Sequence, residues 1–181
     1  MPAAARDPRP LTGEPLALDL LNTRWNTEGS GRDLLDDAEG LAVWLAANGL
    51  DGAHPAGPDV LRHLRQAREA LRTAVDGSPR EGAPLVDAVL AHGRVRVRLT
   101  ADGAAEEPEF ADPSWGPAWL AARNYLDLLA KAPDRIRVCA HETCVLHFFD
   151  TSRNGTRRWC SMAACGNRAK ASRHYARAKE S

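Results

Sequence analysis

The sequence predicts a mainly α-helical protein with a small β component, the α+β fold class, and three patterns support this. Apolar residues recur at helical spacing in three long segments before residue 133. A shorter segment alternates arginine with valine or leucine, which is typical of a strand with one buried face. After residue 133, short strand-forming and turn-forming runs are followed by a proline-free run of good helix formers.

The three long helices are predicted from apolar residues at steps of three and four. They run from Leu34 to Leu45, from Val60 to Ala74 and from Trp119 to Lys131. Asn48-Gly49 follows the first of them and is typical of a C-terminal cap. The second helix carries four arginines between its apolar positions, and we expect them on a solvated face: Arg62, Arg65, Arg68 and Arg72.

Weaker patterns predict the rest of the first part. A helix is favoured over 14–24, where a strand also fits, and another over 84–91. The strand with one buried face runs from Arg94 to Leu99, and Asp102-Gly103 supplies a turn after it. The stretch from Ala104 to Gly116, which holds acidic residues and two prolines, is predicted to be a loop or the remainder of a hairpin.

All four cysteines lie near the C-terminus, in the pattern C-x4-C-x15-C-x4-C: Cys139, Cys144, Cys160 and Cys165. No run of about 18 apolar residues is present for a membrane span, and the N-terminus has no apolar export signal. We therefore expect a cytoplasmic chain with reduced thiols, which favours a metal site over two disulfides.

Four thiolates suit one zinc ion, which takes a tetrahedral set of sulfurs at about 2.3 Å. A site closed by four protein ligands is structural, because it leaves no position for an activated water. The sequence therefore predicts one structural zinc ion and no metal catalysis. His141 and His147 lie beside the first cysteine pair and could replace a ligand only in an incomplete site.

The order of elements around the cysteines predicts a treble-clef-like module made of a knuckle, a β-hairpin and a helix. Residues 145–149 are strand-forming, Asn154-Gly155 is a strong turn, and 157–159 is predicted to return antiparallel to the first strand. Ser161 is a suitable N-cap for a helix over 162–178.

Charge is divided sharply along the chain, although the formal net charge is zero. Residues 1–134 hold 14 Lys+Arg and 21 Asp+Glu (14 − 21 = −7), and residues 135–181 hold 10 and 3 (10 − 3 = +7). A basic module of this kind favours a polyanion as partner, although the two halves could also simply attract each other. The residues predicted to contact nucleic acid are Arg153, Arg157, Arg158, Arg168, Lys170, Arg173 and Arg177.

Two stretches resemble known families. Cys160 to Arg168, read with 149–154 and 157–159, is similar to the CGNR zinc finger, named for residues found here at 165–168. The segment 18–23, Leu-Asp-Leu-Leu-Asn-Thr, resembles the start of the ABATE domain that usually precedes this finger. The resemblance implies two domains, over 13–132 and 133–181, and a bacterial transcriptional regulator. The finger would bind DNA through the zinc module, and the N-terminal domain would sense stress or a ligand.

The residues and the resemblance leave three classes of function to consider. The first is a DNA-binding, nucleoid-associated regulator whose acidic N-terminal domain binds a small-molecule effector or forms a homodimer; Asp19, Asn22 and Arg24 are its candidate ligand-binding residues. The second is a zinc-stabilised protein-interaction module without DNA specificity. The third, an enzyme, is not expected, because a nuclease needs a second, open metal site, and no catalytic residue is predicted.

Overall fold

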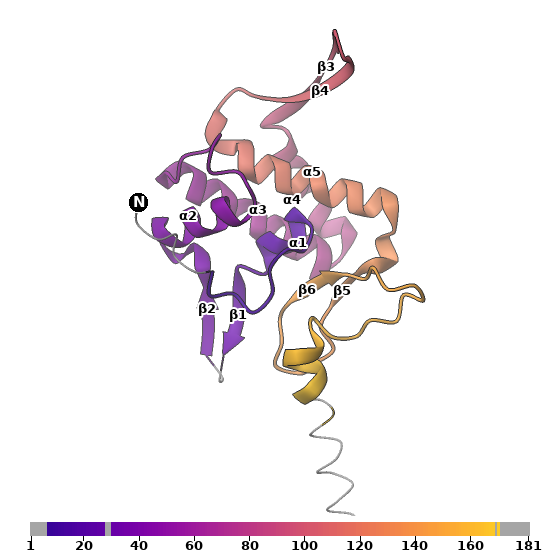
Figure 1. Cartoon of the computed structure of the whole chain (residues 1–181). Helices are drawn as coiled ribbons and strands as arrows, with labels where there is room; N and C mark the ends of the chain where they lie inside the picture. The colour runs from indigo at the N-terminus through magenta and orange to yellow at the C-terminus, as the bar shows by residue number, and fades with distance from the viewer. Residues whose placement is uncertain (1–6, 28–29, 169, 171–181) are drawn as a thin grey trace, which may run out of the picture.

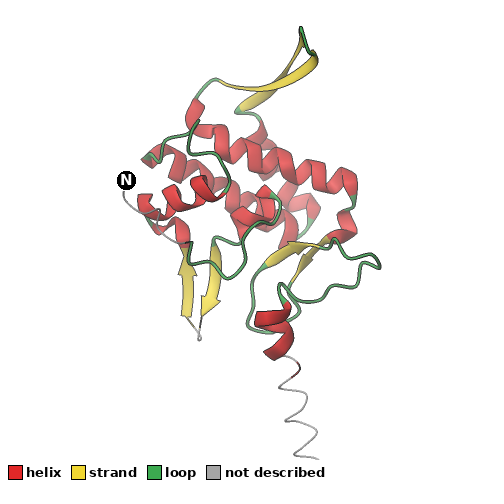
Figure 2. Ribbon diagram, viewed as in Figure 1, coloured by secondary structure: helices red, strands yellow, loops and turns green. Residues whose placement is uncertain are grey.

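The computed structural model describes residues 7–27, 30–168 and 170, and its core is a bundle of helices (Figures 1 and 2). The predicted fold class is confirmed: helices dominate, and the strands form three separate two-stranded antiparallel sheets. The helices of the bundle are α1 (Leu16–Leu21), α2 (Ala38–Ala47), α3 (Pro58–Asp76), α4 (Pro79–Leu90) and α5 (Gly116–Lys131). None of the helices in the described part of the chain is long and apolar enough to cross a membrane.

Helix α3 is the centre of the bundle and packs against α1, α4 and α5. Val60, Leu64, Ala67 and Leu71 are buried along it at steps of three and four, so the predicted amphipathic helix is confirmed. The predicted helix before it is present in two pieces: a 3-10 turn over Leu34–Asp36 and, after the extended residue Asp37, helix α2, which Asn48 caps.

Arg68 is a correction to the expectation that the arginines of α3 face solvent. Its side chain is fully buried and donates hydrogen bonds to Asp33 Oδ1 at 2.6 Å, Asp33 Oδ2 at 2.7 Å and Thr23 Oγ1 at 2.8 Å. Asp33 ends the hairpin of β1 (Arg24–Thr27) and β2 (Ser30–Asp33), which lies over this side of α3. Apolar spacing identifies the face toward the helical core, but it does not reveal a second neighbour on the polar face.

The longest sheet is the hairpin of β3 (Gly93–Thr100) and β4 (Gly103–Phe110), which projects away from the helices (Figure 1). The predicted strand and turn are confirmed, and the stretch predicted to be a loop or the remainder of a hairpin is strand from Gly103 to Phe110. The predicted buried face is wrong: Val97 is 70% exposed and Leu99 is 89% exposed. Alternation shows that one face of a strand is apolar, but burial of that face requires a neighbouring element.

The third sheet pairs β5 (Ile136–Val138) with β6 (His147–Phe149), and this corrects the predicted hairpin. Residues 157–159 form loop instead of returning beside β6. Strand β5, which precedes β6 in the chain, takes the place predicted for 157–159. The 3-10 turn over Pro133–Arg135 brings β5 alongside β6. Ser161 caps the next helical turn as predicted, accepting a hydrogen bond from Ala164 N at 3.0 Å. That turn is π-helical over Met162–Gly166, and most of the predicted helix lies outside the described residues.

Candidate metal centre and basic surface

Local backbone structure brings the four cysteines to one point. Cys139 directly follows β5, and its N–H donates to Leu146 O at 2.9 Å across the knuckle. Cys144 lies in the turn, where its N–H donates to His141 O at 2.9 Å. Cys160 precedes the Ser161 cap and Cys165 lies within the π-helical turn, so the start of this helix supplies the second pair.

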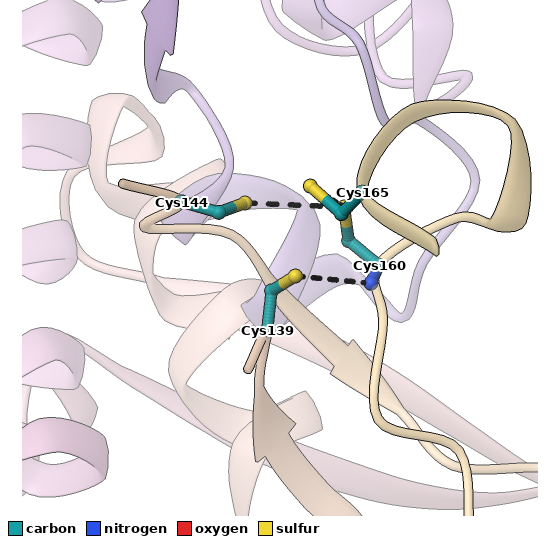
Figure 3. A group of neighbouring side chains, drawn as sticks. All are labelled: Cys139, Cys144, Cys160 and Cys165. Atoms are coloured by element: carbon teal, nitrogen blue, oxygen red, sulfur yellow. Dashed lines mark hydrogen bonds between the residues drawn. The ribbon is translucent and has the colours of Figure 1, made fainter. Parts of the chain in front are cut away.

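The four sulfur atoms surround one small space (Figure 3), and all of them lie within 4.8 Å of one another. The Cys144 and Cys160 sulfurs are 3.9 Å apart, and those of Cys160 and Cys165 are 3.6 Å apart. Four sulfurs at about 2.3 Å from one zinc ion are separated by about 3.8 Å, whereas a disulfide requires about 2.05 Å. The cluster therefore fits one tetrahedral zinc ion and contains no disulfide.

The thiols perturb one another strongly in this small space. The hydrogen bond from Cys160 lowers the pKa of Cys144 to about 5, and the same contact raises the pKa of Cys160. Burial raises the pKa of Cys165 to about 12. Four thiolates at this separation repel one another, so the fully ionised set requires a cation at its centre. Cys160 N–H also donates to Cys139 Sγ at 3.4 Å, which supports a charged sulfur there.

Neither nearby histidine joins this cluster. His147 is buried, and its Nε2 lies 2.6 Å from Asp76 Oδ1 at the end of α3. The hydrogen bond to His147 lowers the pKa of the Asp76 carboxyl. His141 Nδ1 lies 3.3 Å from Thr143 Oγ1. Among the described residues, the four cysteines are the single group of potential ligands close enough to share one ion.

The module rests directly on the helical bundle. Asn22, at the end of α1, donates from Nδ2 to His147 O at 2.9 Å and accepts from His147 N at 2.8 Å, as a neighbouring strand would. Glu14 accepts from Phe149 N at 2.9 Å and from Arg157 at 3.2 Å. Apolar residues of both parts also belong to one buried cluster. The core therefore continues across the predicted boundary at Pro133.

The predicted ligand-binding residues make contacts within the protein and do not share one pocket. Asp19 is buried and accepts from Arg9 at 2.7 Å and from Asn48 at 3.0 Å. Arg24 donates to Asp33 at 2.9 Å on the β1–β2 hairpin. Asn22 holds the module through its two hydrogen bonds. Their role toward a ligand stays a prediction.

The predicted nucleic-acid residues divide into two groups. Arg157 is engaged internally: its guanidinium lies 4.1 Å from the Phe148 ring centroid and donates to Glu14 and to the Trp159 and Cys160 carbonyls. The residues with exposed side chains, which make no ion pair within the described part, are Arg153, Arg158, Arg168 and Lys170. Arg173 and Arg177 lie outside the described residues.

Sequence reasoning missed the residues that join the module to the bundle. Glu14 and Asp76 are isolated acids in the sequence, and no local pattern pairs either with a residue more than 70 positions away. Asp150 is also buried, and it accepts from Ser152 N at 2.9 Å and Arg157 N at 3.0 Å to shape the long loop. In the sequence, the turn-forming run around Asn154-Gly155 was the one pattern that indicated this loop.

Comparison with known families gives two adjacent matches. Residues 14–132 match the ABATE family, described as "Putative stress-induced transcription regulator", and residues 135–178 match the CGNR zinc finger. The resemblances seen in the sequence are thus confirmed in the predicted order. A search of curated proteins gave no match.

Proposed function

Because this chain belongs to the ABATE family and ends in a CGNR zinc finger, we propose that it is a zinc-dependent DNA-binding transcription regulator. The observation that carries the proposal is that four exposed cations lie on the two segments that precede and follow the second cysteine pair of a four-sulfur site. Zinc would be held by Cys139, Cys144, Cys160 and Cys165 and would supply rigidity rather than chemistry. The protein would act in the cytoplasm, at the nucleoid.

The basic surface is suited to phosphates, since its charge is not consumed inside the protein. Among the predicted residues that the structure describes, Arg157 alone forms an ion pair with the acidic N-terminal part, through Glu14. Arg153 and Arg158 lie on the long loop before Cys160, and Arg168 and Lys170 follow the π-helical turn that holds Cys165, so two segments carry the charge. Phosphate contacts from two segments define an orientation on DNA, which a single flexible arm does not.

Contacts between the helical bundle and the finger support the proposal that a signal passes from one to the other. Asn22 and Asp76 belong to bundle elements and contact His147, three residues after the zinc ligand Cys144. A small-molecule effector that shifts α1 or the end of α3 would therefore move β6. The proposed regulator catalyses no reaction.

A protein-interaction module is the second candidate, and the contact between finger and bundle favours it, since Glu14 and Asp76 already engage the finger. In this case the exposed cations would bind an acidic partner protein. DNA binding separates the two candidates.

Salt-dependent DNA binding by the full zinc-loaded chain tests the proposal. Four phosphate contacts give a slope of log affinity against log salt of about −3.6 on duplex DNA. Replacing Arg153 and Arg158 by serine is expected to reduce that slope by about 2. Arg80→Ser with Arg123→Ser removes the same charge from the bundle, at exposed Arg80 and partly buried Arg123, and should leave the slope unchanged.

Selection from random DNA then tests sequence specificity, with Cys160→Ser as the control that lacks a complete zinc site. A common motif recovered only by the intact protein supports a regulator. Absence of DNA binding at low salt by the folded, zinc-loaded protein would exclude the DNA proposal and leave the interaction module.

A further inference from the structure

The exposed apolar side chains of this protein gather on two features. Eight large apolar residues are exposed in the described part of the chain, and six of them lie on the β3–β4 hairpin or on α4 and α5. The hairpin contributes Val95, Val97 and Leu99, and the two helices contribute Leu85, Leu126 and Leu129. Such clustering marks an interaction surface, whereas single exposed apolar residues do not.

The hairpin has one apolar and one charged face. Val95, Val97 and Leu99 share a face with their partners in the register, Pro108, Glu106 and Ala104, so Glu106 is the one charged residue on this otherwise apolar face. The opposite face carries three arginines that pair with acids of β4: Arg94 and Arg96 with Glu109, and Arg98 with Glu107. Two glutamates balance two of the three arginines, so the charged face keeps an excess of one positive charge. A two-stranded hairpin standing alone in water is marginally stable, so its apolar face needs a cover.

A groove between α4 and α5 offers a complementary apolar surface. Its cavity of about 440 Å³ is lined by apolar side chains, including Val86, Leu90, Leu126 and Leu129, and by one charged residue, Asp87. Tyr125 also lines it and is otherwise buried against α3, with its hydroxyl 3.4 Å from Ala74 O.

The hairpin projects away from the helices of its own chain (Figure 1), and its base is fixed. Only Ala91 and His92 separate α4 from β3. Trp119 Nε1 donates to Leu90 O at 2.9 Å, and Trp115 is stacked between the rings of His63 and His92 at 3.8 and 3.5 Å. Both strands therefore leave the bundle in a set direction, outward from the helices (Figure 1).

We propose that two copies of this chain exchange hairpins, so that the Val95, Val97 and Leu99 face of each copy lies in the α4–α5 groove of the other. Eight residues per strand and two strands give a face of about 27 by 10 Å, or about 270 Å². Two reciprocal contacts that cover the whole face bury about 1,100 Å² in total, which exceeds the roughly 1,000 Å² that a biological interface should reach. Stacking the two hairpins on each other would bury only about half of that area. The exchange is a closed two-fold arrangement and does not depend on DNA binding.

The mass of the full zinc-loaded protein in solution, measured by light scattering after size exclusion, tests this dimer. The wild type is expected at twice the 19.6 kDa of one chain. An arm variant, Val97→Glu with Leu99→Glu, and a groove variant, Leu126→Glu with Leu129→Glu, should each be monomeric, with dimer affinity reduced by about 100-fold. The control, Arg96→Gln with Arg98→Gln, alters the charged face of the same strand and should remain dimeric.

Mixing the two defective variants provides the sharper result. The intact arm of the groove variant can enter the intact groove of the arm variant, so the mixture should regain part of the dimer. A monomeric wild type, or a groove variant as dimeric as the wild type, overturns the proposal. A photo-crosslinking residue at the exposed position Leu99 gives an independent readout and should link to residues 83–90 or 125–129 of a second chain; links confined to its own chain or to the other hairpin would refute the exchange.

Discussion

Asn22 makes the most consequential single contact between the two parts of the chain. Its amide satisfies both backbone polar groups of His147, and the residue is fully buried. A buried backbone group that loses its partner costs about 1–3 kcal/mol. The contact therefore fixes where β6 lies as well as contributing to stability.

Replacing Asn22 by alanine is expected to lower the free energy of unfolding by about 2–4 kcal/mol, because both His147 groups lose their partner. Denaturant titration of the zinc-loaded protein measures this. Asn26→Ala is the matched control, since Asn26 also bonds the finger, at Thr143 O, but is exposed; its loss should cost less than about 1 kcal/mol. Equal effects of the two substitutions would contradict the interpretation.

Asp33 predicts a pH dependence of stability. Burial raises the pKa of its carboxyl, but hydrogen bonds from Arg68 and Arg24 outweigh burial and hold the pKa below its usual range. A group whose pKa is lowered by folding stabilises the protein above its unfolded pKa of about 3.9. That stabilisation is lost as the pH falls through the lower pKa of the folded state.

Asp33→Asn keeps the acceptor that caps Leu35 N but removes the charge that pairs with buried Arg68. The variant should be less stable than wild type by about 3 kcal/mol at neutral pH. Denaturation at a series of pH values should show this difference shrinking below about pH 4. Asp36→Asn, an exposed neighbour, should show little difference at any pH. A difference for Asp33→Asn that stays constant down to pH 3 would be inconsistent with the ion pair.

At the scale of elements, the crossing of α3 and α4 depends on a missing side chain. A Cβ at Gly82 would lie 2.3 Å from Ala74 Cα and 2.5 Å from Ala74 Cβ. The two helices can approach this closely only because neither presents a bulky residue there. The same contact positions α4, and with it the groove and the base of the hairpin.

Gly82→Ala is expected to destabilise the protein by about 1–3 kcal/mol, because overpacking outweighs the gain in helix propensity. Thermal unfolding measures the change. Gly52→Ala is the control: a Cβ at Gly52 meets no atom within 4 Å, so its effect should stay within about 0.5 kcal/mol. A stabilised Gly82→Ala protein would mean that the helices can separate without loss.

At the scale of the whole molecule, the zinc module and the helical bundle form one buried cluster. Cys139, Cys160 and Cys165 belong to the same apolar cluster as Leu18 and Leu21 of α1. The finger is therefore part of the protein's core. Without it, apolar residues of the bundle would be exposed where β6 lies. Unfolding of either part should therefore destabilise the other.

Removal of zinc by a chelator is expected to lower the unfolding temperature of the entire chain in a single transition. Structural zinc contributes about 10–16 kcal/mol in isolated fingers, and Asn22 and Asp76 lose their partners when the finger unfolds. Calorimetry with and without chelator measures this, and added zinc should restore the transition. Two separate transitions, with the bundle unaffected, would mean that the shared core contributes little.

Local patterns along the chain determined the helices, the strand at 94–99, the Ser161 cap and the zinc ligands. Each of these depends on residues a few positions apart or, for the cysteines, on a chemistry so specific that spacing is enough. Tertiary structure alone decided that Arg68 is buried, that β6 pairs with β5, that Asn22 and Asp76 hold His147, and that the apolar face of β3–β4 is left exposed. Each of these depends on which distant element packs against the residue or face. Periodicity shows whether a face is apolar or polar, but it does not show which element covers that face.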